Sequence, residues 1–182
     1  KSVPSLVGLD ELESLNLSSN QLTKLPDEAI QLPSLHELDV GGNPLAELPD
    51  RIGLLRSLYV FNAPATAISI LPASIGQIRL LRSLDVQSCR LQSLPPEIGE
   101  LRELRHVNVQ DNPLAALPDE VGQWQRLTRL NLSDTKLAAL PETVSGWTAL
   151  QELRMDRTPL QSLPAGVSGW KSLRFLSLNL AR

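Results

Sequence analysis

Residues 35–57 read LHELDVGGNPLAELPDRIGLLRS, and the pattern LxxLxLxxNxLxxLPxxIGxLxx in this stretch decides the fold. The pattern returns every 23 residues without insertion or deletion. Self-similarity at a fixed period of about 20 to 29 residues is typical of a solenoid, in which each unit packs against its neighbours. The units begin at Leu12, Leu35, Leu58, Leu81, Leu104, Leu127, Leu150 and Leu173.

Each unit combines a strand pattern with a helix-start pattern. Leucines such as Leu15 and Leu17 alternate with polar residues, which predicts a short strand whose leucines point inward. A proline followed by acidic residues, as at Pro26 and Asp27, favours a short helix or 3₁₀ turn. We therefore predict an α/β repeat fold: a curved solenoid with a parallel inner sheet and short helices or 3₁₀ turns on the convex side.

Two positions of the unit have expected structural roles. The Asn slot, occupied by Asn20, Asn43 and Asn112, falls where the strand turns and backbone groups lose their ladder partners. Thr or Cys89 replaces Asn in other units, and we interpret this as structural variation. A tryptophan column with one ring per unit predicts core packing, with a ligand platform as the alternative. Its members are Trp124, Trp147 and Trp170.

Composition limits the classes of partner. The net charge is −3, from 17 basic and 20 acidic residues without a run of either sign, so we expect no nucleic-acid partner. No stretch approaches the roughly 18 apolar residues of a membrane span, and the start KSVPSL lacks a signal-sequence pattern, so we expect no membrane partner. The single Cys89 excludes an internal disulfide framework and points to a reducing, cytoplasmic compartment.

The residue types needed for catalysis do not occur in a usable arrangement. His36 and His106 lie 70 positions apart and share no metal-ligand spacing with Cys89. The glycine-rich phosphate-binding motifs are absent from the sequence. We therefore expect no catalytic residue, no metal site and no cofactor in this chain.

The pattern resembles the leucine-rich-repeat family, and within it the 23-residue LPxxIG subtype. The complete units extend from residues 12–34 through 150–172. Units such as LPPEIGELRELRHVNVQDNPLAALPDEVGQW are closest in style to the repeat domains of bacterial type III effectors. The pattern is also similar to repeats of Ras-signalling scaffolds, plant intracellular repeat proteins and Roco GTPases.

The resemblance implies a scaffold for protein–protein interaction in signalling or virulence. Such a chain would act in the cytoplasm, or in a host-cell cytoplasm if it is an effector. The alternative that the resemblance implies is the substrate-recognition part of an enzyme, with ubiquitin ligation, nucleotide transfer or GTP hydrolysis in a domain outside this chain.

Residues 1–182 are expected to form one repeat domain of a longer protein. Residues 1–11 would be the tail of a preceding repeat, because Leu6 and Leu9 have the spacing of its back half. The last unit, LRFLSLNLAR, ends just after its strand, and an uncovered sheet edge is a pairing hazard. The alternative to a monomeric binder is a protein that assembles through its sheet edges or its tryptophan column.

Outward-pointing positions beside the strand leucines supply the candidate binding residues. In the second half of the chain they predict a mixed-charge patch that binds another protein through the concave face. The alternative is a solvated face with mutual ion pairs. The residues are His106, Asn108, Asp111, Arg129, Asn131, Asp134, Arg154, Asp156 and Arg157.

The third unit is apolar at its strand edge. Tyr59, Val60 and Pro64 stand where other units carry polar side chains, and Ala63 replaces an inward leucine. Either these residues pack locally or they present a secondary apolar patch for a partner.

Overall fold

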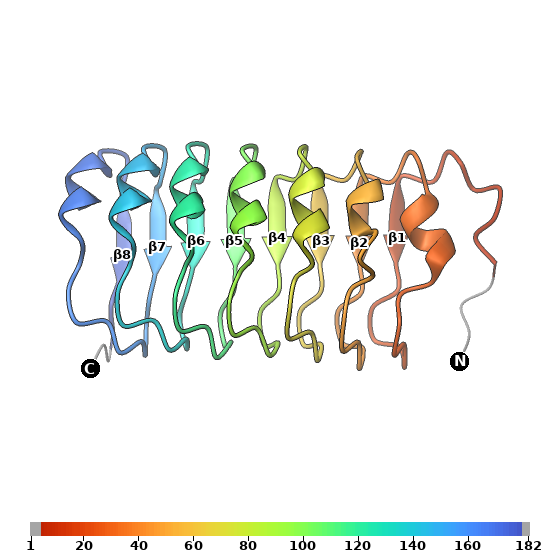
Figure 1. Cartoon of the computed structure of the whole chain (residues 1–182), viewed down its shortest axis with the longest axis horizontal. Coiled ribbons are helices and arrows are strands. Elements are labelled where there is room, and N and C mark those ends of the chain that lie inside the picture. Colours follow the sequence, from red (N-terminus) through yellow and green to blue (C-terminus); the bar gives the residue numbers. More distant parts are fainter. Residues whose placement is uncertain (1–4, 180–182) are drawn as a thin grey trace.

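The computed structural model describes residues 5–179 and confirms the curved solenoid (Figure 1). Eight parallel strands form one sheet in chain order, and each strand pairs with the next at an offset of one unit, as Ser14 pairs with Glu37. The strands are β1 (Ser14–Asn16), β2 (Glu37–Asp39), β3 (Val60–Asn62), β4 (Ser83–Asp85), β5 (His106–Asn108), β6 (Arg129–Asn131), β7 (Glu152–Arg154) and β8 (Phe175–Ser177).

Short 3₁₀ helices lie along the other side of the solenoid (Figure 1). All but η2 begin directly after the proline of the LP motif, whose fixed φ and missing N–H suit the start of a helical turn. The helices are η1 (Asp27–Gln31), η2 (Ile52–Leu54), η3 (Ala73–Gln77), η4 (Pro96–Glu100), η5 (Asp119–Gln123), η6 (Glu142–Gly146) and η7 (Ala165–Gly169).

The core runs between the two layers as a continuous aliphatic stack. Leu35, Leu38 and Leu45 of the second unit are fully buried, as the repeat pattern predicts. In the third unit the larger Phe61 takes a leucine position, and the smaller Ala63 follows two residues later. Both are fully buried, so the two changes of volume offset each other within one layer.

The tryptophan column is part of this core. The three indoles are buried, and consecutive rings stack with centroids 6.5 and 5.8 Å apart. The prediction of core packing is confirmed, and the alternative of a ligand platform is wrong. Each Nε1–H donates to a carbonyl oxygen of the preceding unit: Trp124 to Ile98 at 2.9 Å, Trp147 to Val121 at 2.8 Å and Trp170 to Val144 at 2.8 Å.

The Asn slot satisfies backbone groups at the strand turn, as expected, and at Asn43 and Asn112 it also bonds to the preceding unit. The amide nitrogen of Asn112 donates to the carbonyl oxygens of Val86 at 2.9 Å and Val109 at 3.0 Å, and its Oδ1 accepts from the N–H of Leu91 at 2.9 Å. Asn112 therefore satisfies backbone groups of two units at once.

Cys89 fills the same slot in its unit. Its Sγ lies 3.3 Å from the carbonyl oxygen of Ala63 and 3.2 Å from Oγ1 of Thr66. Burial raises the pKa of the Cys89 thiol above its ordinary value, which favours the protonated form that can donate to a carbonyl. The interpretation of Cys89 as a structural replacement for Asn fits these contacts.

In each of the first seven units, the residue two positions after the second strand leucine adopts a left-handed backbone conformation. Among these residues only Gly42 is a glycine, with a φ of 64°. Ala65, Asp111, Asp134 and Arg157 hold φ values of 53°, 54°, 58° and 55°. Such a conformation costs a non-glycine residue about 1–2 kcal/mol, so the turn is imposed by the packing of the repeat.

The N-terminal segment is described from residue 5. Leu6 is buried and Leu9 is exposed. Residues 1–4 of the predicted tail 1–11, and residues 180–182 of the last unit, lie outside the described residues. The division into one domain of a longer protein stays a prediction.

Candidate functional site

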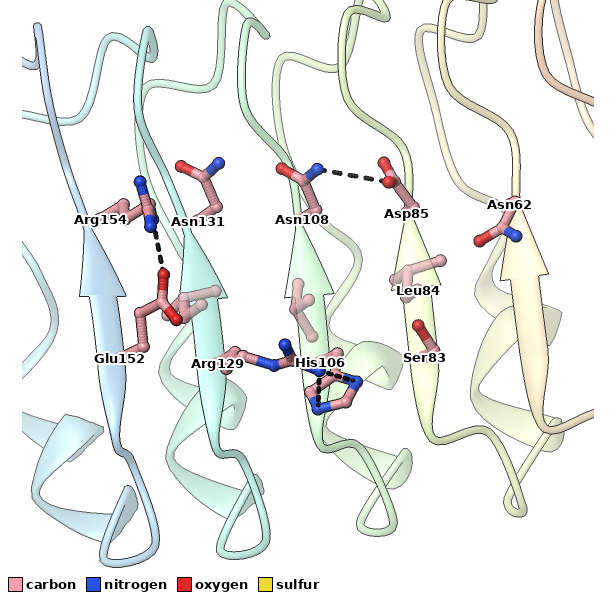
Figure 2. A pocket seen from close by; sticks show the side chains of 12 residues that line it. Asn62, Ser83, Leu84, Asp85, His106, Asn108, Arg129, Asn131, Glu152 and Arg154 are labelled. Carbon is pink, nitrogen blue, oxygen red and sulfur yellow. Dashed lines mark hydrogen bonds and ion pairs between the residues drawn. The ribbon is translucent and has the colours of Figure 1, made fainter. Parts of the chain in front are cut away.

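Side chains of strands β3 to β7 line a shallow hollow of about 340 Å³ on the inner face of the sheet (Figure 2). Because the strands are in register, its polar side chains form two rows. The strand-start row comprises Ser83, His106, Arg129 and Glu152. The strand-end row comprises Asn62, Asp85, Asn108, Asn131 and Arg154.

The hollow brings together five of the predicted residues and not the other four. His106, Asn108, Arg129, Asn131 and Arg154 line it. The remaining four lie beyond the strand ends, and three of them line a separate hollow of about 430 Å³ that also contains Cys89 and Lys136. These four residues are Asp111, Asp134, Asp156 and Arg157.

In the strand-start row, Arg129 leans over the neighbouring histidine. One of its terminal nitrogens lies 2.8 Å from Nε2 of His106 and 3.3 Å from Nδ1. Burial, and then the positive charges of Arg129 and Arg105, lower the pKa of His106 below its ordinary value. His106 is therefore neutral at neutral pH, and it holds the guanidinium in place without cancelling its charge.

Arg154 is held from two sides at the far end of the hollow. Its Nε donates to Oε1 of Glu152 at 2.6 Å, as Figure 2 shows, and its guanidinium carbon lies 4.8 Å from the ring centroid of Phe175. These two contacts orient the side chain, and within residues 5–179 the side-chain hydrogen bond of Arg154 is made by Nε alone.

The strand-end row has a backbone function that the sequence interpretation missed. Oδ1 of Asn108 accepts the N–H of Gln110 at 3.2 Å, and Oδ1 of Asn131 accepts the N–H of Ser133 at 3.1 Å. These bonds to the residue two positions later are Asx turns, which end the strand. The same bond is made at Asn16, Asp39 and Asp85.

The amide nitrogens of this row are also engaged. Nδ2 of Asn108 donates to Oδ2 of Asp85 at 3.3 Å and to Oε1 of Gln87 at 3.1 Å, and Nδ2 of Asn131 donates to Oε1 of Gln110 at 2.8 Å. Asn108 and Asn131 are therefore parts of a structural ladder that forms the floor of the site.

Asn62 is a site residue that sequence reasoning did not select. It lines the hollow from β3, but the residue two positions later is Pro64, which has no N–H to donate. Within residues 5–179, its side chain takes part in no hydrogen bond. The signal was present in the sequence, because an Asn followed two residues later by Pro cannot form the Asx turn of the other units.

The residues beyond the strand ends are mostly paired with one another. Arg157 forms a two-bond ion pair with Asp134, at 2.5 Å for each bond, and this pair lowers the pKa of Asp134. Asp156 accepts from the hydroxyl of Ser177 at 2.6 Å and from the N–H of Asn179 at 2.7 Å. The alternative to a binding patch is a solvated face with mutual ion pairs. That alternative describes these outer residues better than it describes the residues of the hollow.

The apolar third unit is half-covered by its own neighbours. Tyr59, Val60 and Pro64 are half-buried. The ring of Tyr59 stacks on His36 with centroids 4.9 Å apart, and the guanidinium of Arg82 lies 4.8 Å from its centroid. His36 and Arg82 thus cover part of the Tyr59 ring. The secondary apolar patch stays a prediction.

Neither a membrane span nor a metal cluster is found in the described part of the chain. Residues 5–179 contain no helix long and apolar enough to cross a bilayer. The same residues contain no group of three or more His, Cys, Asp or Glu side chains that could hold a metal ion.

Comparison with known families identifies the repeat. The family described as Leucine Rich repeats (2 copies) matches residues 10–53, and the family described as Leucine Rich Repeat matches residues 80–101. The fold is a leucine-rich-repeat solenoid. No curated protein has a sequence that matches this chain.

Solved leucine-rich-repeat structures resemble the chain over nearly its whole length. A leucine-rich-repeat protein of Leptospira interrogans has a TM-score of 0.94 and 32% identity, covering 98% of this chain and 46% of that one. The plant peptide hormone receptor RGFR1 in complex with RGF2 has a TM-score of 0.83 and 30% identity, covering 94% and 28%. An internalin of Listeria monocytogenes, with a TM-score of 0.73, 16% identity and coverage of 96% and 57%, shows the fold alone.

The chain spans less than two thirds of the length of each of these three proteins. Leucine-rich-repeat arrays are generally non-catalytic scaffolds for protein–protein interaction, because stacked repeats create an extended concave surface.

Proposed function

We propose that this chain is a protein-binding module that recognises a folded partner through the hollow over β3 to β7. One observation carries the proposal. The side chains of Asn62 and Arg154 do not form the Asx turn that other residues of the strand-end row form, because Pro64 has no N–H and arginine has no acceptor oxygen. In the strand-start row, the side chain of Arg129 contacts a neutral histidine. Polar groups that the fold does not need are suited to contacts with a partner.

We further propose that the chain acts as a monomer in the cytoplasm, as the partner-selecting region of a larger signalling or effector protein. The similarity of its repeat style to type III effectors supports a role in virulence, inside a host cell. The same binding face would serve as a substrate-recognition surface if a catalytic domain accompanies it.

A capture experiment with paired charge reversals tests the binding face. The whole chain and the Arg129→Glu/Arg154→Glu variant are immobilised, and proteins retained from cell extracts are quantified by mass spectrometry. The proposal predicts at least one protein that the wild type retains and the variant loses, because reversed charges inside the hollow repel what the arginines attract.

The control is Arg79→Glu/Arg102→Glu, which makes the same change in charge at two exposed residues, each two positions after the end of η3 or η4. The control is expected to retain the same protein as the wild type. Equal loss from both variants, or equal retention by both, would contradict binding at the hollow.

A further inference from the structure

Three arginines follow one another where strands β4, β5 and β6 begin. Arg82 and Arg105 directly precede β4 and β5, and Arg129 is the first residue of β6. The backbone ladder passes through them, since the N–H of Arg105 donates to the oxygen of Arg82 at 2.8 Å and the N–H of Arg129 to the oxygen of Arg105 at 2.9 Å. All three are exposed. We call Arg82, Arg105 and Arg129 the arginine edge.

The acidic side chains nearby have other partners. Glu103 forms an ion pair with Arg126, and Glu152 forms one with Arg154 at 2.6 Å. Asp85, in the strand-end row, accepts hydrogen bonds from the N–H of Gln87 at 3.0 Å and from Nδ2 of Asn108 at 3.3 Å. In the part of the chain that the structure describes, no carboxylate forms an ion pair with any residue of the arginine edge. A chain with a net charge of −3 thus carries an uncompensated basic row beside its hollow.

The contacts of the arginine edge leave its charge in place. The guanidinium of Arg82 lies over the ring of Tyr59, and that of Arg129 contacts the uncharged ring of His106. Both contacts orient an arginine without neutralising it, and a partly fixed guanidinium loses less entropy when a carboxylate binds.

The spacing of the arginine edge selects one kind of partner segment. Neighbouring strands lie about 4.8 Å apart, and an α-helix advances about 5.4 Å per turn. Along the solenoid axis, these periods differ by only about 1 Å over the two steps from β4 to β6. Arg129 lies one residue, about 3.3 Å, further along its strand than Arg105, because its register partner on β5 is His106. An arginine side chain is long enough to span both distances. An extended segment repeats its same-side residues at about 6.8 Å, so it is displaced by about 4 Å over the same two steps.

We propose that the arginine edge binds an acidic α-helix of the partner, which lies along the axis of the solenoid at the strand-start side of the hollow and presents Asp or Glu once per turn. Positions i, i+4 and i+7 of a helix share one flank and meet this requirement. This inference rests on the proposed function and names the kind of partner.

A designed peptide tests the inference with the whole chain. The probe is an alanine-rich helix with Glu at i, i+4 and i+7, and the reference peptide has the same composition with the three Glu spread around the helix. Affinities are measured by fluorescence anisotropy. The flank peptide is expected to bind about tenfold or more tightly than the reference, since three exposed ion pairs act together.

Arginine variants show where the peptide binds. Arg82→Gln/Arg105→Gln/Arg129→Gln is expected to weaken the flank peptide about tenfold or more. The single variant Arg105→Gln, which leaves the other contacts intact, is expected to weaken it about two- to threefold. The matched control is Arg56→Gln/Arg79→Gln/Arg102→Gln, which removes three exposed arginines at equal spacing outside the inner sheet and is expected to leave binding unchanged.

Two results would overturn the acidic-helix proposal: equal affinity of the two peptides, or equal loss in both triple variants, which indicates general charge attraction. Its failure is distinct from failure of the proposed function. If extract proteins are still lost by Arg129→Glu/Arg154→Glu while the peptide does not bind, the hollow binds a partner of another kind.

Discussion

The indole Nε1–H of Trp147 donates a hydrogen bond of 2.8 Å to the carbonyl oxygen of Val121, which belongs to the preceding unit. This bond satisfies a buried carbonyl and stacks one repeat on the next through a rigid ring. Because the bond recurs at Trp124 and Trp170, the later units are joined by a hydrogen-bonded column as well as by aliphatic packing.

Trp147→Phe is expected to lower the free energy of unfolding by about 3 kcal/mol, because it leaves a small cavity and removes the partner of a buried carbonyl. Urea denaturation followed by circular dichroism measures the change. A loss below about 1 kcal/mol would contradict this role of the indole N–H.

Asn112→Ala should destabilise the protein by about 2–4 kcal/mol, since it removes a side chain that serves buried backbone groups of two units. Asn112→Thr is the matched variant, because Thr135 and Thr158 occupy the same slot and bond a carbonyl of their own unit. We expect Thr to recover about half of the loss. If Thr and Ala destabilise equally, the hydroxyl does not replace the amide in this slot.

Ala65→Gly is expected to stabilise the fold slightly, by about 0.5 kcal/mol, because relief of the left-handed backbone exceeds the entropy cost of glycine. Gly42→Ala at the equivalent position should cost about 1 kcal/mol. Thermal unfolding measures both changes. The opposite sign at either position would contradict a strained turn at this position of the repeat.

The pKa of His106 is lowered in the folded protein, so the unfolded chain binds more protons as the pH falls through about 6.5. Stability should therefore be independent of this group above pH 6.5 and should decrease below it. His106→Gln is expected to remove this part of the decrease in chemical denaturation measured from pH 7.5 to 5. A wild type and variant that lose stability in parallel over this range would show that His106 does not contribute.

The acid dependence of Asp134 provides an internal reference. The pKa of Asp134 is lowered in the folded protein, so ionised Asp134 stabilises the fold at pH values above its ordinary pKa of 3.8. This stabilisation is lost as the pH falls through the folded-state pKa. The His106→Gln variant should keep this decrease below pH 4, since the pair with Arg157 is unchanged.

The sequence predicted the sheet well because each strand leucine can be buried only on the side of the strand that faces the core. A shift of one residue would turn Leu38 outward and Glu37 inward, so the register follows from the alternation alone. The tryptophan column was predictable for the same reason, since a fixed period places the rings at one level of the stack.

The candidate site was predicted only in part. Alternation shows that Asn108 and Asn131 point outward, but it does not show that their carboxamides end the strands by binding nearby N–H groups. Two more residues of the predicted patch, Asp134 and Arg157, form an ion pair across neighbouring units. Contacts between units depend on side-chain conformations, which a one-dimensional pattern does not specify.

Site-specific photo-crosslinking tests binding at the hollow most directly. A photoreactive phenylalanine is placed at Ser83, which lines the hollow, or at Gln123, an exposed residue at the end of η5. After irradiation with the extract protein that the wild type captures, the Ser83 derivative should give a covalent adduct and the Gln123 derivative should not. An adduct from Gln123 alone would contradict recognition through the inner face.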